Sequence, residues 1–464
     1  MRDLFRIQYH LDSIPVPEIK FPSNSRSRLY AILRSLQEIY PQRERILTLI
    51  SNDIEKDTKR RGPKGMTCWQ LLILLALRTR KRVSYDDLEV EFNENATVRA
   101  MLELDPDSTK RFSSRTLSAN YRKISSETID KCIGLISDIA LPIFGDDGKS
   151  IRADSFVCQT NIHFPTDQYL VYDAGRKVLS LGNKIFGPQN GWRQSSHLEK
   201  NLKALAREVS LSKHGGGKGK ATRVKRAYAK LIKLGKKIYT LSNESASNEN
   251  KEHSELIHYS VLLEVAIDIT WRRTQNNEKI ENSEKLLSVF ETHTQLINRG
   301  KIPLPIEFGH RVVVSQSISG MIVDFRVMDK GLTDRDETDM LIERLFKKFG
   351  KLKVCSVDKG YWYADIYETN EHKVELLVAP KKGKSSKKSY DREHEDSFIE
   401  NRKWRSGVES LISALQRADG LDKCRDRGYE GYKRWVSSGV LQRNLITFGT
   451  YLLEIGKKTD KIAS

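Results

Sequence analysis

Residues 352–362, LKVCSVDKGYW, form an apolar run that ends on a carboxylate, Asp358. The few polar side chains of this run predict a buried strand. An unpaired carboxylate in such a place is unfavourable unless a cation compensates it. Gly360 then allows the chain to turn tightly towards a helix. The stretch therefore predicts a strand that presents Asp358 to a cation.

Two further acids occupy comparable settings. Asp154 lies on a second strand, IRADSFV (151–157), and Glu409 lies in the helical pattern RKWRSGVESLISALQR (402–417). Carboxylates on rigid elements are the usual ligands of hard divalent cations. Strand, strand and helix, each supplying one carboxylate, is the order expected of a site where two divalent cations bridge a phosphate.

The helical pattern around Glu409 also carries guanidinium groups. Arg402, Arg405 and Glu409 are spaced i, i+3, i+7, which predicts that they share one face of a single helix. A carboxylate for metal beside guanidinium groups for phosphate suits the cutting of a phosphodiester. The alternative is an ordinary surface ion pair between Arg405 and Glu409.

The composition points to a folded protein with a polyanionic partner. The 464 residues are enough for two or three domains, and the formal net charge is +19. Simple solubility is the other explanation of such a charge. No run approaches a membrane span and the N-terminus lacks the apolar core of a signal peptide, so we expect a cytoplasmic protein. Five widely spaced cysteines without a CxxC pair predict buried thiols, neither disulfide-bonded nor zinc-bound.

Residues 1–145 read as an all-helical domain. Cap residues precede apolar periodicity at Thr67, Ser84 and Ser114, and a longer helix is predicted over 127–143. Short helices with basic exteriors favour a helix-turn-helix-like DNA-binding domain. A plain packing domain is the alternative.

An α/β domain is predicted over 146–189 and 301–417. Residues 167–180 read as a hairpin arm, and 310–329 read as two β-rich arms around Ser319 and Gly320. A helix from Asp334 that ends at Gly350, two further strands and the Glu409 helix complete a β-β-β-α-β-α-β-α order. This order matches an RNase H-like mixed sheet, interrupted by a helical insertion.

The insertion, residues 190–300, is polar and basic. Between 213 and 237 there are ten Lys or Arg residues and no acids. A basic helix of this kind is suited to binding phosphates along a duplex, although a solvated helix face is the alternative. The candidate DNA contacts are Lys220, Arg223, Lys225, Arg226 and Lys230. GGGKGK lacks the spacing of a P-loop.

Residues 418–464 form a predicted C-terminal helical tail. Its apolar stripe has two explanations, an interface or core packing. The residues of the stripe are Trp435, Val436, Val440 and Leu441.

Several strings of this chain carry a family likeness. They are DSFVCQTNIHFPTD (154–167), DKGY (358–361), RSGVESLISALQR (405–417), GLDKCRDRGYEGYKRWVSSGVLQRNL (420–445) and, upstream, GPKGMT (62–67) and SYDDLE (84–89). They resemble DDE transposases of bacterial insertion sequences, in particular the ISNCY-like group. The likeness covers most of the chain from about residue 60. TNIHFPTD is its most specific part.

The resemblance implies a function and a site. Asp154, Asp358 and Glu409 would be the catalytic acids that hold two Mg²⁺ or Mn²⁺ ions, and double-stranded DNA would be cleaved and joined. A homodimer on two DNA ends, in a nucleoid-associated protein, is also implied. A metal-dependent nuclease without strand transfer, a DNA-binding regulator on a transposase scaffold and an RNA-processing enzyme remain alternatives.

The chain departs from the related Y-x2-R-x3-E-x6-K signature at two positions. Arg405 and Glu409 match, but Arg402 stands at the tyrosine position and Gln416 at the lysine position. Arg417, next to Gln416, is the expected replacement for the DNA contact.

Two more residues come from the family-like string. His163 and Asp167 are candidates for a place beside the site. An ordinary polar role in the hairpin is the other explanation of His163.

Overall fold

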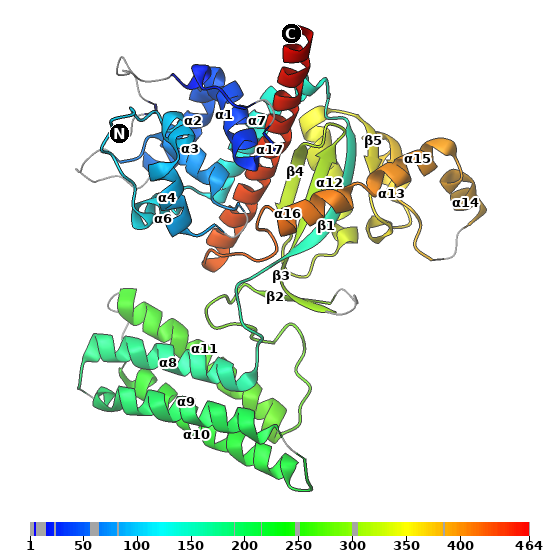
Figure 1. Ribbon diagram of the computed structural model, residues 1–464. Coiled ribbons are helices and arrows are strands. Elements are labelled where there is room, and N and C mark those ends of the chain that lie inside the picture. The colour runs from blue at the N-terminus through cyan, green and yellow to red at the C-terminus, as the bar shows by residue number, and fades with distance from the viewer. Residues whose placement is uncertain are drawn as a thin grey trace. The chain divides into compact units, whose positions relative to one another are not determined.

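The computed structural model describes residues 4–5, 15–22, 25–55, 65–80, 83–189, 191–214, 216–245, 251–298, 305–383 and 386–463. The chain divides into two compact units (Figure 1). Residues 1–160 and 309–464 form the first, which we call the mixed unit. Residues 161–308 form the second, the helical unit. Residues 62–64, the start of the GPKGMT string, lie outside the described residues.

The sheet is mixed, which confirms the α/β class. Its principal strands are β1 (Ser150–Gln159), β3 (Ile306–Ser317), β4 (Ile322–Val327), β5 (Leu352–Ser356) and β6 (Val374–Val378). A short strand, β2 (Gln295–Asn298), makes six. Strand β1 is antiparallel to β3 and parallel to β5, while β6 extends β5 in parallel and β4 pairs antiparallel with β3. The principal strands therefore run in the order β4-β3-β1-β5-β6, with β1 at the centre.

The two β-rich arms predicted over 310–329 are confirmed as β3 and β4. Gly320 in the turn between them has a φ of 89°, a conformation that favours glycine. The predicted helix from Asp334 is confirmed as α12 (Asp334–Phe349), and Gly350 follows it with a φ of 74°. The later helices are α13 (Ile366–Asn370), α14 (Lys387–Glu393), α15 (Asp396–Arg405) and α16 (Val408–Arg417).

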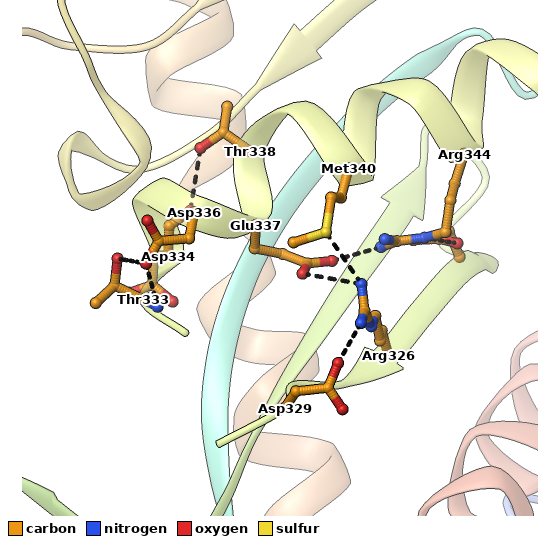
Figure 2. Close-up of polar contacts among 10 residues, drawn as sticks. Arg326, Asp329, Thr333, Asp334, Asp336, Glu337, Thr338, Met340 and Arg344 are labelled. Atoms are coloured by element: carbon orange, nitrogen blue, oxygen red, sulfur yellow. Dashed lines mark hydrogen bonds and ion pairs between the residues drawn. The ribbon is translucent and has the colours of Figure 1, made fainter. Parts of the chain in front are cut away.

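A buried carboxylate fixes α12 to the sheet (Figure 2). Glu337 is fully buried, and its oxygens lie 2.8 Å from Arg344 Nη2 and 3.6 Å from Arg326 Nη1. Arg344 also contacts Asp324 of β4 at 2.9 Å. Because a buried charge is tolerated only when it is paired, this network holds α12 in one register against β4.

The elements described before residue 145 are all helices, as predicted. Its helices are α1 (Arg28–Ile39), α2 (Arg43–Glu55), α3 (Cys68–Leu77), α4 (Tyr85–Glu94), α5 (Ala96–Met101), α6 (Ser114–Tyr121) and α7 (Ser126–Phe144). Thr67 and Ser84 cap α3 and α4 through reciprocal capping boxes. The cap of α6 is Ser113, one residue before the predicted Ser114.

The C-terminal helix α17 (Gly428–Ala463) packs against α1, α3 and α7. Its stripe is core: Trp435, Val436, Val440 and Leu441 are all buried in the cluster that also contains the sheet. The segments 1–145 and 418–464 therefore share one core with the sheet. All five cysteines are buried and free, which confirms the prediction of buried thiols.

The helical unit has its own apolar core, formed by α8 (Asp167–Phe186), α9 (Ser195–Ser212), α10 (Lys220–Ser245) and α11 (Lys251–Gln275). The prediction of a hairpin arm over 167–180 was wrong. Leu170, Val171, Ala174 and Val178 recur every three or four residues and are all buried, which makes them the inner face of a helix. The helical unit accordingly starts at residue 161 and not at 190.

Candidate active site

The sheet brings the three predicted acids to one place. Asp154 lies in the central strand β1, and Asp358 follows β5, the parallel neighbour of β1. Asp358 is also the cap of a short 3₁₀ helix, Lys359–Tyr361. Glu409 lies in the first turn of α16, which contacts β1.

One guanidinium stands among these carboxylates. Arg405 Nη1 donates to Asp154 Oδ2 at 3.0 Å, and Nη2 lies 3.5 Å from Asp358 Oδ1 and 3.9 Å from Glu409 Oε1. The Arg405 side chain is only 13% exposed. The ion pair between Arg405 and Glu409 was the alternative explanation from sequence. It is the longest of the three ion pairs that Arg405 makes with these acids. Arg405 compensates all three acids at once.

The site becomes more open from Asp154 outwards. The side chain of Asp154 is 20% exposed, that of Asp358 42% and that of Glu409 71%. Burial raises the pKa of Asp154 above its usual value, and the charges of Asp358 and Asp334 act in the same direction. The Ser155 backbone N–H and Arg405 oppose this rise. The ionised form of Asp154 is therefore less favoured than that of an ordinary exposed aspartate.

The carboxylate oxygens of Asp154, Asp358 and Glu409 suit a hard cation chemically. In this structure, however, the three carboxylates are not arranged to share one. Carboxylate oxygens are the ligands that Mg²⁺ and Mn²⁺ prefer. In the part of the chain that the structure describes, no group of three or more Asp, Glu, His or Cys side chains is arranged to hold a metal ion. Arg405 fills the centre. A cation shared by the three acids requires the guanidinium to move.

Divalent-cation affinity should depend on pH through Asp154. Cation binding needs the ionised carboxylate, so protons compete with it and affinity falls as pH falls. Because the pKa of Asp154 is raised, we expect this loss to begin at a higher pH than its ordinary pKa of 3.8 would give. Calorimetric titration with Mn²⁺ between about pH 7 and about pH 4 measures it. An affinity that stays constant over that range contradicts the role of Asp154.

The helix predicted over 402–417 is broken in the structure. Helix α15 ends at Arg405, and α16 begins at Val408. Arg152 of β1 donates through Nη1 to Trp404 O at 2.7 Å, and a Cβ at Gly407 would collide with this Nη1. The prediction that Arg402, Arg405 and Glu409 share one helical face was therefore wrong. Arg402 is exposed, whereas Arg405 points into the acid cluster.

Gln416, at the lysine position of the signature, has a contact within the fold. Its Nε2 donates to Val157 O of β1 at 3.1 Å, so it ties α16 to the strand that carries Asp154. Arg417 is exposed beside it, as a contact with DNA requires.

The structure adds residues that the sequence did not single out. Asp334, the first residue of α12, accepts from Ser155 Oγ at 2.6 Å, next to Asp154. Tyr361, in the DKGY string, is fully buried, and the charges of Asp334 and Asp154 act on its hydroxyl. An acid at the start of a helix is ordinary, so the sequence held no signal for Asp334.

The two residues proposed to lie beside the site are paired within the helical unit. His163 Nε2 lies 3.3 Å from Asp173 Oδ2. Asp167 accepts from Arg273 Nη1 at 2.8 Å. Asp167 begins α8, so the hairpin in which His163 was expected is absent and these side chains serve the start of a helix instead.

The basic run forms a hollow on the helical unit. Its volume is about 1040 Å³, between α10 and the C-terminal end of α11. Five cationic residues and no acid line it: Lys218, Lys220, Lys225, Arg226 and Arg273. Arg223 is exposed on α10, and Lys230 is paired with Glu208 at 2.8 Å. The predicted DNA contacts are therefore not equivalent, because the charge of Lys230 is held in an ion pair with Glu208.

Comparison with protein-family models found no match, and searches of curated proteins and of solved structures found none either. None of the helices in the described ranges has the length and apolarity needed to cross a membrane.

Proposed function

We propose that this protein is a DDE transposase with an RNase H-like catalytic domain, which binds the ends of an insertion sequence and cleaves and joins DNA. The convergence of Asp154, Asp358 and Glu409 on Arg405 carries the proposal. These acids come from three separate elements, and Arg405 compensates their negative charge at the place that we propose for the divalent cations.

The fold supports the same proposal. Strands β1, β3 and β4, helix α12, β5, α13, β6 and the final helices follow the β-β-β-α-β-α-β-α order of an RNase H-like domain. The observed sheet order places the strands of Asp154 and Asp358 side by side. Both acids therefore reach one end of the sheet from rigid elements.

Each residue has a distinct part in the proposed reaction. Two divalent cations, when bound, supply activation of the attacking oxygen and stabilisation of the leaving oxygen. Asp154 and Asp358 would hold them, and Glu409 would complete the ligand set. Arg405, once released from the acids, is positioned for a phosphate oxygen. Hydrolysis would free a 3′-OH, which would attack target DNA by the same in-line displacement.

A strand-joining assay tests the proposal. A labelled duplex carrying the DNA that flanks the gene is incubated with protein, a second duplex and Mg²⁺ or Mn²⁺. We expect cleavage followed by joining of the labelled end to the second duplex, and neither in EDTA. Cleavage without joining would favour a nuclease. Binding without cleavage under any metal condition would favour a regulator, and preference for RNA would favour RNA processing.

We also propose that the basic hollow binds the backbone of double-stranded DNA. Lys220 and Arg226 are exposed and line it. Replacing both by alanine should lower the salt dependence of DNA binding by about 0.9 per lost phosphate contact. Lys184, paired with Glu252 at 2.6 Å in the same unit, is the matched control. A double variant with the wild-type salt dependence contradicts the assignment.

The assembly and location follow from the proposed reaction. Bringing two element ends together requires a homodimer or larger assembly on DNA, and a DNA-bound protein in the cytoplasm would be associated with the nucleoid. Analytical ultracentrifugation of the full chain with and without end DNA measures the assembly.

A further inference from the structure

Asp334 lies where the two acid-bearing segments of the proposed site meet. It is the first residue of α12, directly after Thr333, and the capping box between Thr333 and Asp336 fixes this turn (Figure 2). The Asp336 carboxylate accepts the hydrogen bonds that the Thr333 N–H and hydroxyl donate in that cap. Glu337 points away, towards Arg326 and Arg344. The carboxylate of Asp334 is left to face β1 and the DKGY string.

The contacts of Asp334 reach both segments. Ser155 Oγ donates to Asp334 Oδ1 at 2.6 Å, and Ser155 directly follows Asp154. On the other side, a Cβ built on Gly360 would lie 3.5 Å from Asp334 Oδ2, so the DKGY turn passes close to the carboxylate. Arg311 Nη1, at 3.6 Å, only partly compensates its charge. The Asp334 side chain is 26% exposed and so remains open to small ions.

A buried hydroxyl gives an independent sign of a missing ligand. Tyr361 is fully buried, and no hydrogen bond of ordinary length and angle reaches its hydroxyl among the described residues, although the Ser155 side chain is near enough to act on it as a hydrogen-bonding group. The charges of the Asp334 and Asp154 carboxylates also act on this hydroxyl. Buried polar groups are normally satisfied, and an unsatisfied one is costly. Thr338 Oγ1 donates to Tyr361 O at 2.8 Å, which holds the tyrosine against α12.

We propose that Asp334 is a fourth carboxylate ligand of the site, taking a divalent cation together with Asp154. Ser155 Oγ turns away to release Oδ1 when the cation binds. Tyr361 is a positioning residue, whose hydroxyl donates to the carboxylates or to a water on the cation. This inference rests on the proposed function, and it enlarges the ligand set from three acids to four. Four carboxylates supply enough oxygen donors for two hard cations with fewer shared ligands.

The proposal is tested by Mn²⁺ titration of the full chain, followed by calorimetry and by the electron paramagnetic resonance of free Mn²⁺. We expect two bound ions in the wild type. Asp334→Asn should lose one ion or bind it at least tenfold more weakly. Asp336→Asn is the matched control from the same turn: it should lower the melting temperature and leave Mn²⁺ binding unchanged.

The outcomes separate this inference from the proposed function. Wild-type Mn²⁺ binding by Asp334→Asn, with weakened binding by Asp154→Asn, overturns the role of Asp334 alone. Unchanged binding by both variants overturns the proposed metal site as well. If Asp334→Asn does not fold, Ser155→Ala tests the role of Asp334 instead. It frees Asp334 Oδ1, so Mn²⁺ should bind at least threefold more tightly, and unchanged or weaker binding overturns the proposal.

Discussion

Replacing Asp154 or Asp358 by asparagine, or Glu409 by glutamine, is expected to lower the rate of DNA cleavage by roughly a thousandfold or more. Each change removes one carboxylate charge from the group that surrounds Arg405 and leaves the side-chain shape intact. Single-turnover cleavage of end DNA in Mg²⁺ measures the loss. Binding of the DNA at low salt should change little, because it depends mainly on basic residues elsewhere.

Controls distinguish a lost site from a damaged fold. Asp365, seven residues after Asp358, is exposed, and Asp365→Asn should cleave DNA at the wild-type rate. Asp154→Asn should not lower the stability of the metal-free protein. The folded-state pKa of Asp154 is raised, so its ionised form opposes folding above that pKa and a neutral side chain removes the penalty. Full cleavage by any one of the three variants contradicts the assignment of that acid.

Replacing Arg405 by glutamine should destabilise the metal-free protein by about 2 kcal/mol. Three carboxylates would then stand together without the guanidinium that compensates them, and Asp154 is mostly buried. The same change removes the internal competitor of a divalent cation. Added Mn²⁺ should therefore raise the melting temperature of Arg405→Gln by more than that of the wild type.

The matched control for Arg405 is Arg402, one turn earlier on α15. It is exposed, so Arg402→Gln should change the free energy of unfolding by no more than about 0.5 kcal/mol. Its response to Mn²⁺ should equal that of the wild type. An equal Mn²⁺ response in Arg405→Gln and the wild type would show that Arg405 does not occupy the position of a cation.

Local signals predicted much of the fold. Thr67 and Ser84 start their helices where a hydroxyl cap precedes an apolar run, and the strand after Gly350 ends just before Asp358, as its apolar run indicated. These features depend on neighbours in the sequence. The helix over 167–186 was missed although its buried residues recur at helical spacing. These residues pack against α9, α10 and α11, which were assigned to a separate insertion starting at residue 190.

Tertiary contacts account for what the sequence did not show at the site. The break between α15 and α16 depends on Arg152, which lies some 250 residues earlier and binds the Trp404 carbonyl. The inward position of Arg405 depends on the same break. Asp334 reaches Ser155 only when α12 packs against the sheet. The three acids and Arg405 were singled out from sequence, whereas Arg152 and Asp334 were not.

The most direct test of this account is an anomalous difference map from a crystal of the full chain grown with Mn²⁺. The account predicts a Mn²⁺ peak within about 2.5 Å of carboxylate oxygens of both Asp154 and Asp358, with the Arg405 guanidinium displaced from between them. A map without a peak at these acids, with Arg405 still bound to Asp154, would contradict it.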